Sequence, residues 1–347
     1  MEAKKVSLKE LMSMDIKDLI KNKNKKNKSK PKKEKELKRE IISFDIGSDY
    51  TKIVVGKYYK GKLSISNYLE FETPKDSVND GLIINEKILA DKIQILLNEN
   101  KIKAKYASFT TNSTTIINRE IIIPKVDEDE VESVIKFEME QYLPINLNDY
   151  IVQYIELDEV EQENSNKLKV YVIAYPEKMA RGYYDILKVL KLKPVSLDVA
   201  FNSLSKLITC TDKVNEDSYD ASLTNVFIDI GSSFTSLSIY KNGKLDFTRI
   251  IRSNYIDTTY DEMIFIQNLS EEIERIIRFY NNKYIGNKID GIYILGGISS
   301  LYNIHEYIGE KINIPTKKIN NIKFNEANIS IDNIENYLNA IGALIRS

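Results

Sequence analysis

The chain has 347 residues, a formal net charge of −1 and an apolar fraction of 42%. This length suggests two domains or one large two-lobed domain, and the apolar fraction is sufficient for a buried core. With one cysteine, Cys210, and one histidine, His305, the composition excludes a disulfide framework, a zinc cluster and a Ser-His-Asp triad, and no run of about 18 apolar residues predicts a membrane span.

The first forty residues are strongly basic. They carry 15 Lys+Arg and 7 Asp+Glu, a net of +8, which leaves −9 for the rest of the chain. Apolar residues at three- and four-residue spacing predict an amphipathic helix over residues 1–20, and the lysine-rich segment 21–39 is expected to be a disordered linker. Residues 1–38 are interpreted as a tether to a partner or an anionic membrane surface, with a solvated tail as the alternative. Nucleic acid is not expected as a partner, because the arm has no aromatic residue that could stack on bases.

One motif occurs twice, 184 residues apart: Asp45-Ile-Gly-Ser48 and Asp229-Ile-Gly-Ser232. Each copy follows an apolar strand, precedes a threonine by three positions, Thr51 or Thr235, and leads into a strand–turn–strand pattern. A duplication of this kind predicts two related half-molecules that hold a nucleotide phosphate and its metal between them. The alternative interpretation is that each copy is only a strand end followed by a turn.

The residue types of the repeat suit phosphate and metal binding. Glycine lets a phosphate approach closely, and the turn amides and hydroxyl groups can donate to its oxygens. The predicted phosphate-binding residues are Gly47, Ser48, Lys52, Gly231, Ser232 and Thr235. Asp45 and Asp229 are predicted to hold a hydrated Mg²⁺ through its water ligands.

Before and after the first motif copy, alternating and apolar patterns predict an α/β lobe. The predicted strands are Ile41–Phe44, Lys52–Tyr59, Lys62–Phe71, Ala107–Thr111 and Thr114–Ile123, with a helix over Glu86–Asn98. Next, Asp127–Glu130 opens a helix that ends at Leu143-Pro144. Two strands, Tyr150–Leu157 and Lys167–Ala174, and a helix, Glu177–Leu190, complete a predicted insertion over residues 119–187.

The rest of the chain repeats the scheme of the first lobe. A helix over Asp198–Leu207 and a polar loop over Thr209–Ser222 are predicted to lead into three strands within Val226–Ile251. A helix follows over Leu269–Tyr280, then a strand, Gly291–Leu295, that ends in Gly296-Gly297. The carboxy-terminal helix is predicted over Ile334–Ile345.

These motifs in this order resemble the actin-like ATPase superfamily, and within it the PilM family of type IV pilus assembly proteins, which is related to FtsA. The two Asp-Ile-Gly motifs match its phosphate loops, Leu295-Gly-Gly297 its adenosine motif, and Ala340–Leu344 its last connecting helix. Ile123-Pro124, Glu138 and Tyr142-Leu-Pro144 match the 1C subdomain that PilM shares with FtsA. The resemblance covers Ile41–Arg346.

The resemblance implies an α/β fold of the actin-like, ribonuclease H-like type, duplicated into two lobes. Lobe 1 (1A) is expected over 40–118 and 188–222, a 1C-type insertion over 119–187, and lobe 2 (2A) over 223–347, with a reduced 2B subdomain at about 255–287. ATP and Mg²⁺ are the implied cofactors, and Gly296 and Gly297 are assigned to the adenosine side. Because no Glu…Lys pair for the nucleoside can be matched, at most weak ATPase activity is expected.

The function implied by the resemblance is that of a cytoplasmic scaffold at the inner face of the cell membrane. The expected partner is the cytoplasmic tail of a PilN-like inner-membrane protein, and through it the pilus motor and platform. The partner groove is assigned to Val134, Phe137, Glu138 and Tyr142, with packing inside the insertion as the alternative role of its apolar members. An FtsA-like division protein and a small-molecule kinase of the same superfamily remain alternatives.

Overall fold

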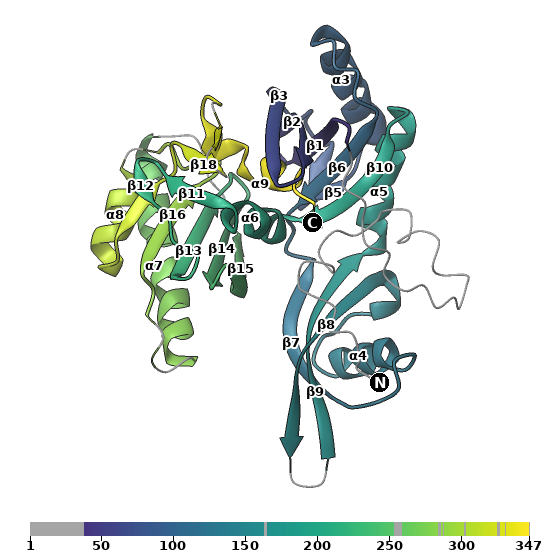
Figure 1. Cartoon of the computed structure of the whole chain (residues 1–347), viewed down its shortest axis with the longest axis vertical. Helices are drawn as coiled ribbons and strands as arrows, with labels where there is room; N and C mark the ends of the chain where they lie inside the picture. Colours follow the sequence, from purple (N-terminus) through teal and green to yellow (C-terminus); the bar gives the residue numbers. More distant parts are fainter. Residues whose placement is uncertain are drawn as a thin grey trace.

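The computed structural model describes residues 38–162, 165–252, 259–283, 286, 288–301, 303–324, 327–329 and 331–346. The predicted helix over 1–20 and nearly all of the linker over 21–39 lie outside these ranges. The described chain forms two lobes with two buried helices between them, and a smaller sheet extends from one lobe (Figure 1). Within these ranges, no helix combines the length and apolar character needed to cross a membrane.

Lobe 1 is built on a five-stranded mixed sheet with the order β10-β6-β1-β2-β3. Its strands are β1 (Ile41–Ile46), β2 (Tyr50–Tyr59), β3 (Lys62–Glu72), β6 (Tyr106–Thr111) and β10 (Lys193–Val199). Between β3 and β6 lie a short hairpin, β4 (Val78–Asn79) and β5 (Leu82–Ile83), and helix α3 (Glu86–Glu99). β1 is nearly continuous in apolar residues because it pairs in the middle of this sheet and is buried on both faces.

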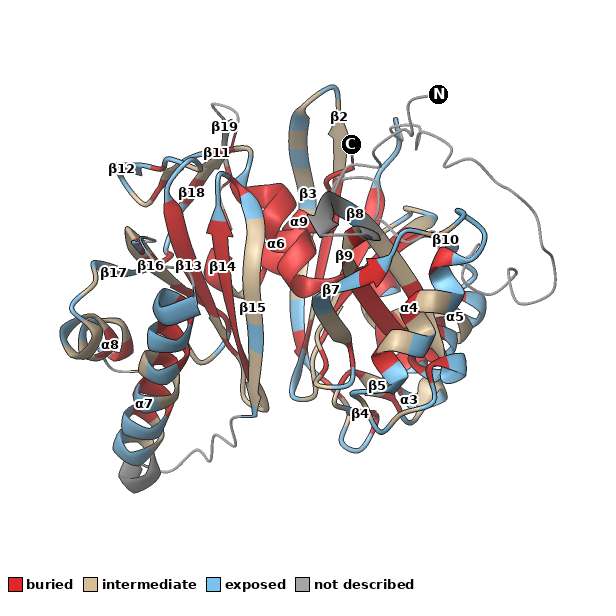
Figure 2. Ribbon diagram, turned by 90° about the horizontal axis from the view of Figure 1, so that it is seen from below, coloured by how far each residue is buried: buried red, intermediate tan, exposed pale blue. Residues whose placement is uncertain are grey.

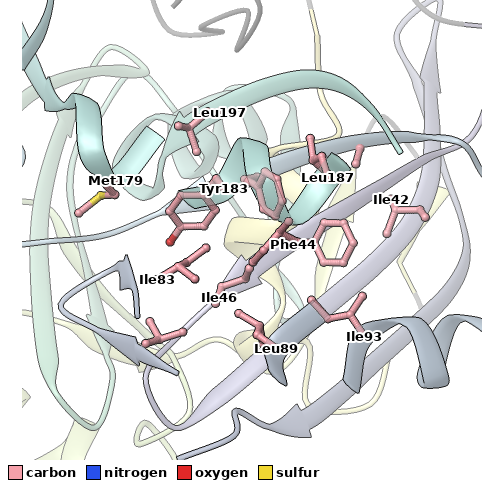
Figure 3. Close-up of a cluster of buried hydrophobic side chains, with 14 of the residues drawn as sticks. Ile42, Phe44, Ile46, Ile83, Leu89, Ile93, Met179, Tyr183, Leu187 and Leu197 are labelled. Atoms are coloured by element: carbon pink, nitrogen blue, oxygen red, sulfur yellow. The ribbon is translucent and has the colours of Figure 1, made fainter. Parts of the chain in front are cut away.

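The core of lobe 1 packs helices α3 and α5 (Glu177–Val189) against this sheet. Figure 3 shows how side chains from β1, α3 and α5 meet in this core. The rings of Phe44 and Phe109 are stacked, with 5.1 Å between their centroids. The sequence assigned α5 to the insertion. Its buried residues, among them Met179, Tyr183 and Leu187, belong instead to the lobe 1 core, because they face the apolar side of that sheet.

Lobe 2 repeats this sheet. Written in the same direction as that of lobe 1, its strand order is β17-β16-β13-β14-β15. Its strands are β13 (Thr224–Ile230), β14 (Phe234–Lys241), β15 (Lys244–Arg252), β16 (Gly291–Leu295) and β17 (Thr316–Lys318). Helices α7 (Thr259–Lys283) and α8 (Ile304–Ile312) cover one face. The predicted start of α7 at Leu269 is wrong, because the helix begins ten residues earlier. It occupies most of 255–287, the range assigned to a reduced 2B subdomain, and packs on the sheet through residues such as Ile266 and Ile273.

The insertion forms a three-stranded antiparallel sheet with the order β7-β9-β8. β7 (Ile117–Pro124), β8 (Tyr150–Gln162) and β9 (Ser165–Pro176) are joined by helix α4 (Val131–Glu140) and the short turn η2 (Leu147–Asp149). The predicted strand pair is therefore a three-stranded sheet, because β7 adds to the free side of β9. A separate apolar cluster, including Ile135 and Met139 of α4, gives this unit a core of its own.

A further correction concerns residues 209–222, which were predicted as a polar loop. They contain β11 (Thr211–Val214) and β12 (Asp217–Ser218), which join β18 (Ile322–Phe324) and β19 (Ala327–Asn328) in a four-stranded sheet. The partner strand lies more than 100 residues further along the chain, so no local pattern announces the pairing.

Helices α6 (Ala200–Ile208) and α9 (Leu338–Gly342) lie between the two lobes and are buried along their whole lengths (Figure 2). The turn η3 (Ile334–Asn336) precedes α9, so the predicted single helix over Ile334–Ile345 is shorter and broken. The start of α6 is fixed by the buried Asp198 carboxylate, which accepts hydrogen bonds from Asn202 at 2.5 Å and Ser203 at 3.1 Å and pairs with Lys206 at 2.5 Å.

Candidate functional site

The two copies of the repeated motif end equivalent central strands, one in each lobe. Asp45 lies near the end of β1, where it pairs with Lys52 of β2, and Asp229 lies at the matching position of β13, where it pairs with Ser236 of β14. Both carboxylates are half-buried. The charge of Asp229 acts on Asp45, so the fold brings residues 184 positions apart into one site.

Both glycines of the motif are required by a close approach of backbone to backbone. The Gly47 N–H donates to the Tyr50 carbonyl at 3.1 Å, and the Gly231 N–H donates to the Phe234 carbonyl at 2.9 Å. A Cβ atom would lie 2.7 Å from the first carbonyl oxygen and 2.9 Å from the second. Neither glycine has positive φ, so the close approach, and not an unusual backbone angle, is what requires glycine here. Because both amides already donate hydrogen bonds within the turn, hydrogen-bond donors to a phosphate must come from other groups of the turn.

The hydroxyl groups of the motif divide into two kinds. Ser48 and Ser232 are half-buried in their turns and can reach a ligand there. Thr235 is fully buried, so a direct phosphate contact is not available to it in this conformation. Its counterpart Thr51 shows what a buried threonine can do here: it is hydrogen-bonded to Thr73 at 2.8 Å, and Thr73 donates to the Gly47 carbonyl at 2.8 Å.

Asn339 of α9 joins the two aspartates, and sequence reasoning missed it. Its Nδ2 donates to Asp229 Oδ2 at 2.7 Å, and a hydrogen bond with Asn339 also acts on Asp45. The side chain is buried. The sequence signal for it was a polar residue immediately before the small, apolar stretch Ala340–Ala343. A buried amide in a packed helix needs polar partners, and this requirement points to a polar site nearby.

The two carboxylates hold more negative charge than their neighbours offset. Burial raises the pKa of Asp45 to about 6, Lys52 lowers it, and the charge of Asp229 raises it. Burial also raises the pKa of Asp229, against the opposing effects of Asn339 and Lys52. A cation placed between them would relieve this cost, so the donor set fits one hydrated Mg²⁺. Within the described ranges, no group of three or more His, Cys, Asp or Glu residues is arranged to hold a metal by itself.

The raised pKa of Asp45 predicts a pH-dependent stability. In the unfolded chain the carboxyl ionises near its ordinary value of 3.8, whereas in the folded protein it keeps its proton to about pH 6. The contribution of Asp45 to stability is therefore fully present below about pH 4 and is lost as the pH rises through 6.

Asparagine at this position cannot titrate, so the difference in unfolding free energy between Asp45→Asn and the wild-type protein should shift in favour of the variant from pH 4 to pH 7. Urea unfolding of both proteins across this range measures the difference. A difference that does not change with pH would show that Asp45 titrates normally.

The Gly296-Gly297 turn lies beside Asp229, at the end of β13. Gly296 has φ of +95°, and a Cβ atom there would lie 2.4 Å from Asp229 Oδ1. Its N–H donates to the Glu335 carbonyl at 3.1 Å, and the following Ile298 N–H donates to the Ile230 carbonyl at 3.0 Å. Gly296 therefore closes over the end of β13 against Asp229, while Gly297 is exposed with open space around its Cα.

The four residues predicted to form a partner groove lie on or just after α4, far along the chain from these turns. Phe137 and Tyr142 are exposed, at 65% and 71% of their surfaces. Val134 is half-buried against the core of the insertion, and Glu138 is half-buried. The packing alternative thus applies to Val134, whereas the two aromatic rings are left for other contacts.

Comparison with known proteins gives one family. The model of the family described as type IV pilus assembly protein PilM matches residues 43–255. Among solved structures, the chain is similar to one from a "PilM-PilN type IV pilus biogenesis complex", with a TM-score of 0.73 and 19% identity over 89% of this chain and 98% of the other. It is also similar to the ethanolamine utilization protein EutJ from Carboxydothermus hydrogenoformans, with a TM-score of 0.50 and 12% identity over 94% of both chains. The predicted actin-like fold is confirmed.

Proposed function

Because this chain belongs to the PilM family of type IV pilus assembly proteins, we propose that it binds the cytoplasmic tail of a PilN-like inner-membrane protein. The observation that carries this proposal is the pair of exposed aromatic side chains at α4, Phe137 and Tyr142. Exposed aromatic residues on a stable helix are favourable anchors for a peptide, because they offer large contact areas at low entropic cost.

The packing of α4 accounts for the position of these anchors. Val131, Ile135 and Met139 follow helical spacing and are buried against the insertion sheet. Phe137 falls between them on another side of the helix, and Tyr142 follows the end of the helix at Glu140. The half-buried Glu138 adds an acidic group beside the rings. This surface suits a short peptide with apolar and basic residues.

Replacing both Phe137 and Tyr142 with serine is expected to weaken binding of a PilN-like tail peptide at least tenfold. The variant loses the contact area that each ring would bury against the peptide. Anchors of this kind typically contribute about 1–2 kcal/mol or more to the binding free energy. Fluorescence anisotropy with a labelled peptide measures the change.

Phe279→Ser is the matched control for this double variant. It removes a phenylalanine that is 56% exposed on α7, in the other lobe, and should leave the affinity unchanged. Equal affinities for the double variant, the control and the wild-type protein would remove α4 from the proposed binding surface. Absence of binding by the wild-type protein would count against the PilN-like partner itself.

We also propose that the protein binds ATP with Mg²⁺. Asp45 and Asp229 would hold the hydrated ion, and Lys52, Ser48 and Ser232 would contact the phosphates. The bound ion would offset the negative charge of the phosphates and of the two carboxylates. At most weak hydrolysis is expected. In this proposal the subdomains 1A, 1C and 2A form a scaffold in the cytoplasm, at the inner face of the membrane, that connects the partner to the pilus motor and platform.

A further inference from the structure

One end of the lobe 1 sheet is lined by basic side chains. It is formed by four segments: 38–40, 57–62, 100–105 and 190–193. Glu40 is the only acidic residue in these segments. We call this surface the basic pole. It lies at the opposite end of β1 and β2 from the Gly47 turn, because residues 38–40 precede β1 and residues 57–62 form the turn between β2 and β3.

In two of these segments, exposed lysines alternate strictly with apolar residues that pack inward. Lys101, Lys103 and Lys105 are exposed, and the residues between them, Ile102 and Ala104, pack against the lobe 1 core. The start of β10 follows the same pattern, because exposed lysines lie on both sides of Leu192, which also packs against that core. The apolar residues therefore fix the direction of the charged ones.

Strand register brings the four segments together. Ile41 of β1 pairs with Gly56 of β2 on one side and with Tyr106 of β6 on the other. Tyr106 in turn pairs with Lys193 of β10. The Lys193 N–H donates to the carbonyl of Lys105 at 2.7 Å. The basic side chains thus lie together along one end of the sheet.

Two tyrosine rings at this end are surrounded by cations. Lys38, Lys57 and Lys60 each place their Nζ 5.5–5.6 Å from the centroid of the Tyr59 ring. The Tyr106 ring receives two more cations at 5.7 Å, one of them from Arg39, whose Nη1 also donates to the Tyr106 hydroxyl at 3.0 Å. Cation–π contacts reduce the repulsion among these charges, but they do not neutralise them.

Lobe 2 distributes its lysines differently. On the sheet of lobe 2 and its neighbours, Lys317 pairs with Asp217 at 2.6 Å and Lys318 pairs with Glu335 at 2.9 Å. The basic pole is therefore a feature of lobe 1, although the two sheets are related by duplication and the chain beyond residue 40 has a net charge of −9.

We propose that the basic pole docks on a membrane surface that contains anionic lipids. Clustered lysines are attracted to such a surface, with an affinity gain of about fivefold for each lysine. Tyrosine rings suit the interface between lipid and water, as does Val189, which is 53% exposed at the end of α5 near the same end of the sheet. Nucleic acid fits less well, because the two tyrosine rings that could stack on bases already face cations.

Charge and chain direction support the same partner. Lys38 is the first described residue, and the sequence before it continues as the lysine-rich segment that begins at Lys21. Basic residues thus continue along the chain from the pole, as expected for a surface that meets an extended layer of anionic charge. This proposal does not depend on the PilN-like partner or on nucleotide binding.

Sedimentation of the full chain with lipid vesicles tests the proposal. A variant with Lys60, Lys62 and Lys103 replaced by serine removes three exposed charges from the pole. Its affinity for vesicles of phosphatidylcholine with 30% phosphatidylglycerol should fall about tenfold to a hundredfold. The matched control replaces Lys241, Lys244 and Lys288, which are exposed in lobe 2, and should change the affinity less than twofold.

Three outcomes would overturn the proposal. Equal losses for the pole variant and the control would mean that the arrangement of lysines in lobe 1 does not matter. Tight binding to a single-stranded DNA oligonucleotide that the pole variant loses, without vesicle binding by the wild-type protein, would assign the pole to nucleic acid. Vesicles of phosphatidylcholine alone should bind none of the proteins, and binding to them would also contradict an electrostatic contact.

Discussion

Replacing Gly342 with alanine is expected to lower the free energy of unfolding by about 3 kcal/mol, at the upper end of the cost of overpacking. A Cβ atom at this position would lie 2.0 Å from the carbonyl oxygen of Ser203 and 2.4 Å from its carbonyl carbon. Both are backbone atoms of α6, so no side chain can move aside to make room. Helices α6 and α9 would have to separate, although both are buried between the lobes.

Urea unfolding of the ligand-free protein measures this effect as a shift of the midpoint at constant slope. Gly297→Ala is the matched control, because nothing lies within 4 Å of the new methyl group and φ is not positive. It should change the unfolding free energy by less than about 0.5 kcal/mol. If Gly342→Ala were as stable as this control, the close crossing of α6 and α9 would be wrong.

Replacing Asp45 with asparagine is expected to have two opposite effects. At pH 7.5 the ligand-free protein should become more stable, by roughly 1–2 kcal/mol, because the variant no longer carries a charge whose pKa is raised by burial. Mg·ATP binding should weaken about 10–100-fold, because one of the two carboxylates that would hold the hydrated ion is lost. A residue that only ends a strand would produce neither effect.

Calorimetric titration of Mg·ATP and urea unfolding measure the two effects of Asp45→Asn. Asp49→Asn is a suitable control, since Asp49 lies in the same turn with an exposed side chain and should leave both quantities near the wild-type values. Asp229→Ala should lose binding as Asp45→Asn does. If the wild-type protein binds no Mg·ATP at millimolar concentration, the fold serves as a scaffold without nucleotide, and the proposed cofactors are wrong.

Much of the fold follows from local patterns. The alternation in residues 52–71 predicted β2 and β3 within two residues, because each strand contains its own periodicity and the Lys60-Gly61 turn, with φ of 51° and 74°, lies between them. The repeat of Asp-Ile-Gly-Ser predicted the duplication of the sheet, which the equal strand orders of the two lobes confirm. Helix boundaries were less accurate, as the start of α7 shows.

The sequence by itself determined which residues could carry the chemistry: the aspartates, the glycines and the serines of the two motifs. Only the tertiary structure decided which of them meet. It brought Asn339 between Asp45 and Asp229, buried Thr235, placed Gly296 against a carboxylate, and joined β11 to β18. The physical reason is that a local pattern reports the periodicity of one element, whereas burial, pKa and close backbone contact depend on elements distant in the chain.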